Sequence, residues 1–439
     1  MAQYLMISQL GLQMKIKLNN FGLYLILLFL MFVLVHKEVA NIFAFYRELF
    51  GLAFLVLLFI HKSSYIYQSI INRRIIIEII FLMLFPFIII ITALFDPMNV
   101  LYGDPLSEGV TAYDGSVNPK IYVFRNAVIY LPMVFYIAIR GLSKSDINKI
   151  AGVTALFAPI SIIIYMLTVS DDSLLSQFEQ LITGHTGLKP FSIEYNTYVP
   201  CFAIAGLSIL YLMELQYKKY NQIIKVSLIS ILIFVSMFIF FSTSRQSLLL
   251  ALIYITIFAT KNIFYSRWKN ILFYASFGLA LYFCYYLIFL QYGENISVTN
   301  KLTSEVLTSP RLRVALDGLA MLHKTEFFTG AGLTSVLVSG PHNDYVRWIQ
   351  RVGLIFAFIS FYPFFSVMYK SFIDVISSKF DSANLFIFCI SLFIIYNSFF
   401  GHPREDAYQS IWCFLGISMW LGHNNHMRRK KNLNKGKLH

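Results

Sequence analysis

Long stretches of this chain are almost free of charge, and this feature limits the folds open to it more than any other. The clearest are residues 21–35, 75–95, 226–241 and 385–400, and most approach the ~20 residues that a helix needs to cross hydrocarbon. Only helices and closed barrels satisfy their backbone groups in lipid. Barrel strands alternate apolar and polar residues, whereas these runs are apolar on every face. The sequence therefore predicts an all-α polytopic integral membrane protein.

We predict about twelve transmembrane helices in a single membrane domain that covers residues 1–439, since spans of this length recur along the whole chain. Charged residues make up 13% of the chain, against about 25% in soluble domains. The predicted spans lie near residues 21–35, 39–60, 75–95, 122–139, 150–169, 196–215, 224–241, 247–261, 271–290, 352–369, 384–400 and 409–423.

The basic residues decide the predicted orientation. With both termini in the cytoplasm, the inner connections and the tail collect most of the 35 Lys and Arg residues but few of the 22 Asp and Glu residues. This distribution follows the positive-inside rule. The net charge of +13 is thus interpreted as a topology signal and an inner-leaflet contact, and nucleic acid is not an expected partner. The N-terminus runs into the first span without a cleavage site and is interpreted as an uncleaved anchor.

No metal site is predicted, because the four cysteines fall in or beside apolar spans without the spacing of metal ligands. Small buried hydrophobes are the expected role for them. The chain also has long connections on the predicted outer side, at 96–121, 170–195 and 291–351. Residues 291–351 are expected to form a periplasmic loop that contains short amphipathic helices.

Two helix starts are predicted in the loop 291–351. The first is Ser309-Pro310, where a capping hydroxyl precedes a proline suited to the first helical turn, and the segment it opens ends at Gly330-Ala-Gly332. The second follows Pro341 and is expected to continue as a helix into the tenth span. Along that helix, residues four apart share one face.

Arginines and one histidine gather on the outer surface in this topology. Arg245 lies in the short turn between the seventh and eighth spans, Arg311 and Arg313 open the first loop helix, and His342 and Asn343 open the second. The remaining members, one and two turns further on, are Arg347 and Arg351.

These residue types suit a substrate with a diphosphate. The planar guanidinium stays charged and binds phosphate oxygens in a bidentate manner. The helix dipole disfavours the charged form of a histidine at a helix start, so His342 is expected to be neutral and able to accept a proton. Such a histidine could deprotonate a sugar hydroxyl as it attacks an anomeric carbon, while the arginines stabilise the departing diphosphate.

Other interpretations of the same residues remain open. Arginines near a membrane surface also extend to headgroup phosphates, and a His-Asn pair at a helix start also serves as a cap. Arg47 is followed by Glu48 within the second predicted span, and the two either form a self-contained pair or line a cavity. Because an ion inside the membrane is costly, one that is present there is expected to have a function.

Three segments resemble the signatures of the O-antigen polymerase and ligase superfamily. The first is Ser244-Arg245 with the apolar run that follows it. The second is Ser309-Pro-Arg311-Leu, ending in Phe327-Phe-Thr-Gly330-Ala-Gly332. The third is His342-Asn343-Asp-Tyr-Val-Arg347-Trp-Ile-Gln-Arg351-Val-Gly353. The resemblance covers roughly residues 240–355. Many relatives carry an acidic residue just before the closing glycine, where this chain has Gln350-Arg351. A second glycine often follows three residues later, and here that position is Phe356.

The resemblance implies an inverting, metal-independent glycosyltransferase of the GT-C type that needs no cofactor. Its donor and acceptor would be oligosaccharides linked to undecaprenyl diphosphate, its site would face the periplasm from the inner membrane, and a co-polymerase that determines chain length is an implied partner. Arg245 and Arg311 would bind the diphosphate and His342 would be the base. Arg313, Asn343, Arg347, Arg351 and Arg47 are candidate substrate-binding residues.

A polymerase of repeat units is the favoured member of this superfamily, by analogy at the level of the fold. The alternative is a ligase that transfers the lipid-linked glycan to lipid A core, because both enzymes share the donor chemistry. A flippase for lipid-linked oligosaccharides is a further alternative. It is less favoured because residues 224–290 are nearly free of charge, whereas transporters place ionisable groups at mid-depth.

Overall fold

The fold is helical, as predicted. The computed structural model describes residues 20–32, 46–70, 76–94, 129–168, 195–216, 222–241, 245–268, 270–279, 319–320, 322, 324–330, 343–399 and 409–435. Within these residues no strand occurs. The runs that are apolar on every face thus form helices, which satisfy their own backbone groups.

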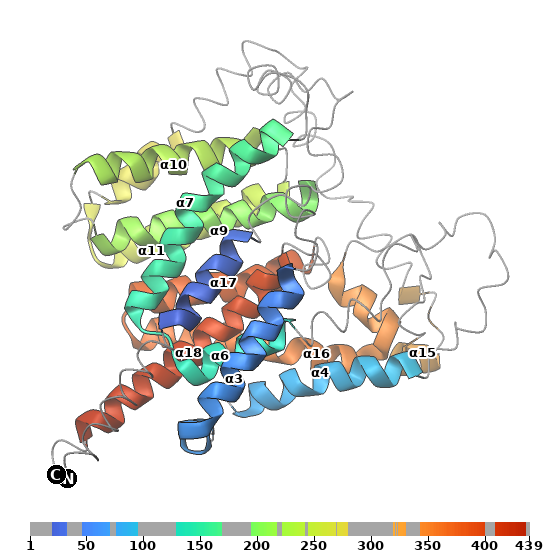
Figure 1. Cartoon of the computed structure of the whole chain (residues 1–439). Helices are drawn as coiled ribbons and strands as arrows, with labels where there is room; N and C mark the ends of the chain where they lie inside the picture. The colour runs from blue at the N-terminus through green and yellow to red at the C-terminus, as the bar shows by residue number, and fades with distance from the viewer. Residues whose placement is uncertain are drawn as a thin grey trace, which may run out of the picture.

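Figure 1 labels the helices in the order in which they follow one another along the chain. The labelled helices are α3 (Tyr46–Ile70), α4 (Ile76–Leu94), α6 (Leu131–Arg140), α7 (Lys144–Thr168), α9 (Tyr195–Gln216), α10 (Gln222–Phe241), α11 (Arg245–Phe264), α15 (Lys324–Thr329), α16 (Asp344–Ser377), α17 (Ser382–Asn397) and α18 (Gln409–Lys435). Two further apolar helices are Asn20–Phe32 and Asn270–Leu279.

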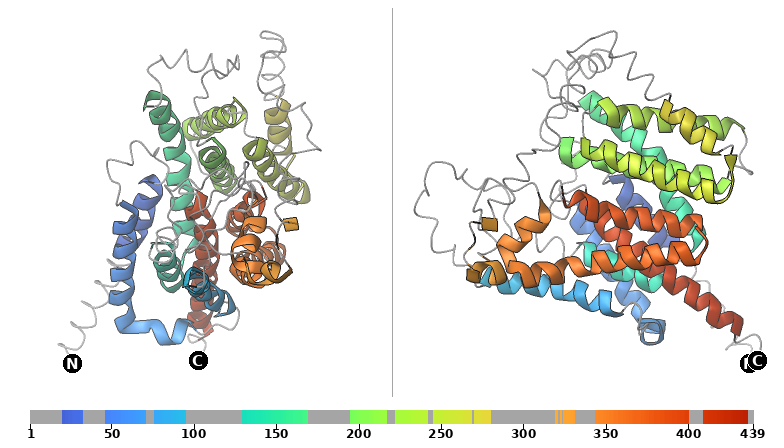
Figure 2. Two further views of the ribbon diagram at one scale, coloured as in Figure 1. Left: turned by 90° about the vertical axis from the view of Figure 1, so that its right-hand side faces the viewer. Right: turned by 180° about the vertical axis from the view of Figure 1, so that it is seen from behind.

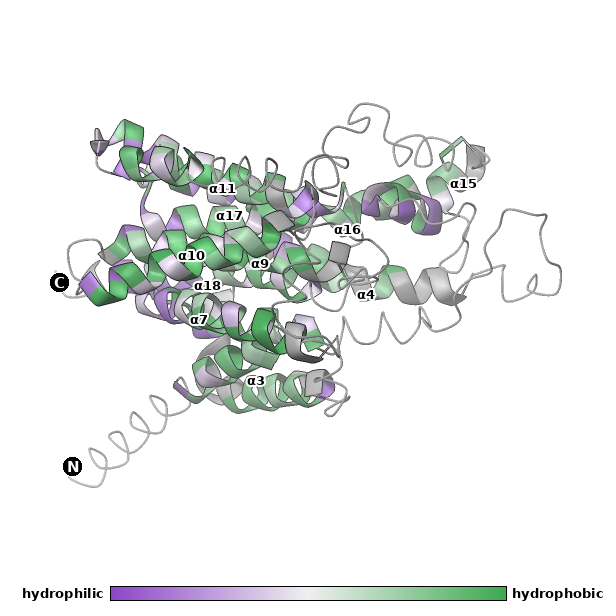
Figure 3. Cartoon of the chain, turned by 90° about the horizontal axis from the view of Figure 1, so that it is seen from above, coloured by the Kyte–Doolittle hydropathy of each residue, from purple (hydrophilic) through white to green (hydrophobic). Residues whose placement is uncertain are grey.

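Three described segments are long and apolar enough to cross a membrane: Lys144–Ile164 in α7, Gln222–Ile239 in α10, and α16. Each of the predicted spans overlaps a described helix. For the shorter helices, the crossing of a bilayer stays a prediction. Many large apolar side chains point outward, among them Phe59, Ile223 and Phe264, each about 70% exposed. Figure 3 shows this apolar colouring along the outer sides of the helices, which suits contact with lipid.

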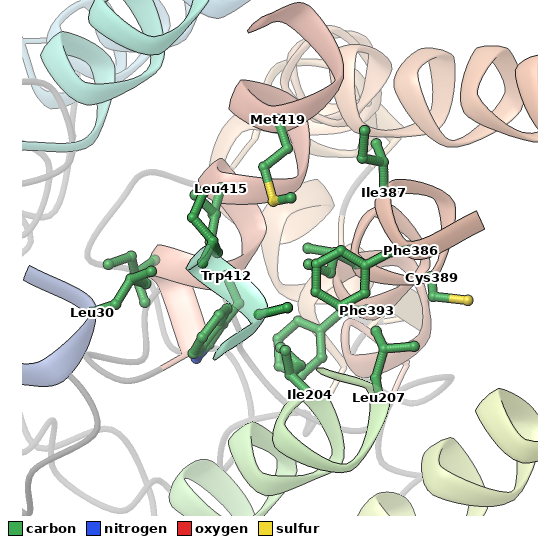
Figure 4. Packing of buried hydrophobic residues seen from close by; sticks show 14 of the residues in the cluster. Leu30, Ile204, Leu207, Phe386, Ile387, Cys389, Phe393, Trp412, Leu415 and Met419 are labelled. Atoms are coloured by element: carbon green, nitrogen blue, oxygen red, sulfur yellow. The ribbon is translucent and has the colours of Figure 1, made fainter. Parts of the chain in front are cut away.

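The helices pack in two groups that share a core (Figures 1 and 2). In one group α7, α10 and α11 pack on α9. In the other, α17 packs on α16 and α18, α18 packs on α6, and α4 packs on α16. Side chains of α9, α17 and α18 meet between the groups. Figure 4 shows Phe386, Phe393 and Trp412 there, and each is at most 1% exposed.

The last helix is longer than predicted. The twelfth span was expected to end near residue 423, but α18 continues to Lys435, and its second half caps the C-terminal end of α6. Asn425 Nδ2 donates to Ala138 O at 2.7 Å, and Arg429 Nη2 donates to Ile139 O at 2.6 Å. The final carbonyls of a helix have no partner within it, so these bonds stabilise the end of α6 and hold the basic tail helical.

Candidate active site at the end of α17

Helix α16 is bent back on itself at Gly353, where φ is 80° and ψ is 165°. The ring centroids of Tyr345 and Phe361 lie 4.5 Å apart, whereas a straight helix would separate residues sixteen apart by ~24 Å. The second loop helix was predicted to continue into the tenth span, and this prediction is wrong. The first arm, residues 344–352, folds against the second, residues 354–377. In Figure 3 the first arm forms a hydrophilic strip beside α15.

Gly353, at the bend, and Gly330, at the end of α15, lie where the backbones of these two segments are in close contact. A Cβ atom on Gly353 would lie 2.1 Å from Phe328 O and 2.7 Å from Gly330 N, and one on Gly330 would lie 2.4 Å from Arg351 O. Both glycines have positive φ angles, and Gly330 follows directly on the end of α15, where such a residue commonly ends a helix. The contact joins the segment of the second signature to the segment of the third.

The start of α16 is held on the last turn of α17. Asp344 N donates to Ser398 O at 2.8 Å, and Tyr345 OH donates to Ile395 O at 2.9 Å. Asn343 is the N-cap, because its Oδ1 accepts from Val346 N at 3.1 Å. Its Nδ2 donates to Phe399 O at 3.4 Å. Asn343 therefore fixes the position of this helix start, and both ends of its side-chain amide are occupied by the protein.

The start of α11 is held on the same turn of α17. Gln246, next to Arg245, donates from Nε2 to Asn397 Oδ1 in a short hydrogen bond. Tyr396 OH donates to Gln246 O at 3.0 Å. The neighbours of Arg245 and of His342 thus contact consecutive residues, Asn397 to Phe399, although about a hundred residues separate them in the sequence.

The structure describes some of the predicted site residues and not others. Arg347 is half-buried and Arg351 is 6% exposed, and both lie on the first arm of α16, four residues apart. Arg245 is the first residue of α11. Arg47 lies in the first turn of α3, and α3 packs mainly against α6. The predicted residues that lie outside the described part of the chain are His342, Arg311 and Arg313.

Sequence reasoning missed three polar residues at this position, Gln246, Asn397 and Ser398. All are buried. Gln246 follows directly on Arg245, which was a signal for it. Asn397 and Ser398 stand in the apolar run 385–400, where an isolated amide and hydroxyl are the sole non-hydrophobic residues after Ser391. Polar groups are costly inside an apolar span, so this pair was a usable sign of a polar site.

The N-terminus of α11, the C-terminus of α17 and the buried Asp344 meet at this position. Helix α11 begins here, and the backbone N–H groups of its first turn have no partner within the helix. The N-terminus of a helix attracts phosphate groups for this reason. In the described part of the chain no group of three potential metal ligands occurs.

No protein-family model matches the chain, and no curated protein matches it. Its relation to the O-antigen polymerase and ligase superfamily therefore remains a resemblance of three short segments.

Proposed function

We propose that this chain polymerises undecaprenyl-diphosphate-linked oligosaccharide repeat units into O-antigen or a related surface polysaccharide. It would act as a metal-independent, inverting glycosyltransferase of the GT-C type at the periplasmic face of the inner membrane. Its helices would cross this membrane about twelve times, with both termini in the cytoplasm. A co-polymerase that sets chain length would be its partner.

Two sets of contacts between the described parts of the motif segments support the proposal. Residues next to Arg245 and His342 hydrogen-bond to the same turn of α17, and Gly330 contacts Gly353. This convergence supports a joint role for segments that are far apart in the sequence. Such a role is what a site with a diphosphate clamp and a base requires.

The proposed reaction transfers the growing glycan from its lipid diphosphate to a sugar hydroxyl of the next lipid-linked unit. The hydroxyl oxygen attacks the anomeric carbon, and His342 takes the hydroxyl proton. The bond between the anomeric carbon and the diphosphate oxygen breaks, and the electron pair leaves with the diphosphate. Arg245 and Arg311, together with the start of α11, stabilise the negative charge that develops there.

Arg347 and Arg351 would bind further anionic or hydroxyl groups of the two substrates from the first arm of α16. Arg313 would do the same from the loop. Asn343 acts in this proposal as a positioning residue, since its amide holds the helix start that directly follows His342 in the sequence.

The glycan profile of a deletion strain tests the proposal. Loss of a polymerase leaves lipid A core bearing a single repeat unit, whereas loss of a ligase leaves bare core. The purified protein in proteoliposomes should then elongate a purified lipid-linked repeat unit. Arg245→Ala and His342→Ala should each abolish elongation while the protein remains in the membrane, and Arg428→Ala, on the exposed tail of α18, is the matched control.

Two results would contradict the proposal. Chain-length ladders of wild-type pattern from both the Arg245→Ala and His342→Ala strains would remove the assigned roles. Bare lipid A core in the deletion strain would instead assign the chain to the ligases.

A further inference from the structure

Three neutral side chains at the end of α17 carry buried polar atoms without a partner. Within the described part of the chain these atoms are Gln246 Oε1, Asn397 Nδ2 and Ser398 Oγ. Gln246 is 6% exposed, and Asn397 and Ser398 are 0% exposed. The large majority of buried polar atoms in proteins are hydrogen-bonded, so three exceptions on neighbouring residues require an explanation. We call these three residues the polar end of α17.

We propose that the polar end of α17 binds hydroxyl groups of a substrate sugar. This inference rests on the proposed function and adds a subsite to it. Gln246 Oε1 can accept a hydrogen bond, Asn397 Nδ2 can donate one, and Ser398 Oγ can do either. A sugar hydroxyl both donates and accepts, so it satisfies an acceptor and a donor that lie together.

The charge of these groups distinguishes the sugar from the diphosphate. All three side chains are neutral, so they gain little from an anion, which the arginines bind in bidentate geometry. The polar end of α17 also contacts the start of α11, which includes Arg245, and the start of α16, which directly follows His342 in the sequence. A sugar held there would therefore lie beside the diphosphate to which it is attached.

The first arm of α16 covers this site in the free protein. Asn343 and Asp344 hydrogen-bond to the carbonyl groups of Phe399 and Ser398. Since the polar atoms are buried, a sugar reaches them when the first arm moves away from the end of α17.

The experiment measures the dissociation constant of two ligands for the purified protein in detergent. One ligand is the purified lipid-linked repeat unit, and the other is undecaprenyl diphosphate without sugar. Ser398→Ala should weaken binding of the lipid-linked repeat about two- to tenfold, which corresponds to one neutral hydrogen bond, and should leave binding of undecaprenyl diphosphate unchanged. The thermal stability of the free protein should be unchanged or higher, because a buried atom without a partner is removed.

Ser391→Ala is the matched control. Ser391 lies on the same helix and is also buried, but its hydroxyl donates to Ile387 O at 2.9 Å. This variant should bind both ligands as the wild type does. Equal dissociation constants of Ser398→Ala and wild type for the lipid-linked repeat would overturn the inference.

A double substitution separates sugar binding from a merely structural role of the amide pair. Gln246→Leu and Asn397→Leu each strand one buried amide and should lower thermal stability, whereas the double variant removes both partners and should recover most of it. The double variant should still bind the lipid-linked repeat at least about tenfold more weakly, because two groups that contact the sugar are lost. Recovered stability together with wild-type affinity would overturn the inference.

Binding and turnover are measured separately, so the two proposals can fail independently. If the variants weaken binding of the lipid-linked repeat but the wild-type protein elongates nothing, the proposed polymerase activity is wrong and the proposed sugar site stands. If the wild type elongates the repeat and all these variants bind it with unchanged affinity, the proposed sugar site is wrong and the proposed polymerase activity stands.

Discussion

Substitution of Gly353 by alanine tests the bend in α16 directly. At this glycine φ is 80° and ψ is 165°, a region that is essentially restricted to glycine. An alanine Cβ would also lie 2.1 Å from Phe328 O and 2.4 Å from the carbonyl carbon of the same residue. These are backbone atoms of α15, so no side-chain rotation relieves the contact.

The expected cost follows from these two effects. A residue other than glycine in such a backbone conformation costs ~1–3 kcal/mol, and overpacking against neighbours that cannot move costs another ~1–3 kcal/mol. Gly353→Ala should therefore lower the free energy of unfolding by ~2–6 kcal/mol, a large part of the ~5–15 kcal/mol that holds a typical domain folded. Gly330→Ala meets Arg351 O at 2.4 Å and should have a similar effect.

Thermal unfolding in detergent, followed by tryptophan fluorescence, is the assay. Gly206→Ala is the control, because nothing lies within 4 Å of a Cβ at this position and alanine is favoured over glycine by ~0.5–1 kcal/mol inside a helix. The double variant of Gly330 and Gly353 should lose less than the sum of the two single variants, since the first substitution already separates the pair. A midpoint of Gly353→Ala equal to that of the wild type would refute the folded-back geometry.

Three further outcomes are expected. Arg245→Lys should keep part of the elongation that Arg245→Ala loses in proteoliposomes, because lysine keeps the charge without the bidentate geometry. Full elongation by Arg245→Lys would show that only the charge of Arg245 matters. Lys261→Met should lower the thermal midpoint and cost ~2–4 kcal/mol, because it removes the ammonium 3.0 Å from the buried Glu214 carboxylate; adding Glu214→Gln should recover part of the loss, and an additive double variant would contradict this coupling. Asn425→Leu should cost ~1–3 kcal/mol by leaving Ala138 O without its donor, whereas the exposed Lys431→Ala should leave the unfolding midpoint unchanged; equal midpoints for both variants would argue against the cap on α6.

Most of the helices could be predicted from runs that are apolar on every face, as in 226–241, which forms most of α10. Their ends were less predictable where tertiary contacts extend them. The extension of α18 to Lys435 depends on bonds from Asn425 and Arg429 to α6. These bonds join residues almost three hundred positions apart, and no local pattern indicates them.

The bend at Gly353 could not be predicted from local sequence. A glycine within a helical pattern is commonly tolerated, and what forces the bend is the close approach of Phe328 and Gly330 from another segment. The candidate site was partly predictable, because the motifs identified the segments that begin α11 and α16. The polar end of α17 was missed because Asn397 and Ser398 are two residues in an otherwise apolar run.

The joint attachment of two motif segments to one turn of α17 has an evolutionary consequence. The geometry of the candidate site depends on Asn397, Ser398 and Phe399 and on the two helix starts that contact them, and does not depend on how many residues connect those starts. Insertions and deletions between residues 280 and 308, ahead of the segment that begins at Ser309, should therefore be tolerated in homologous chains.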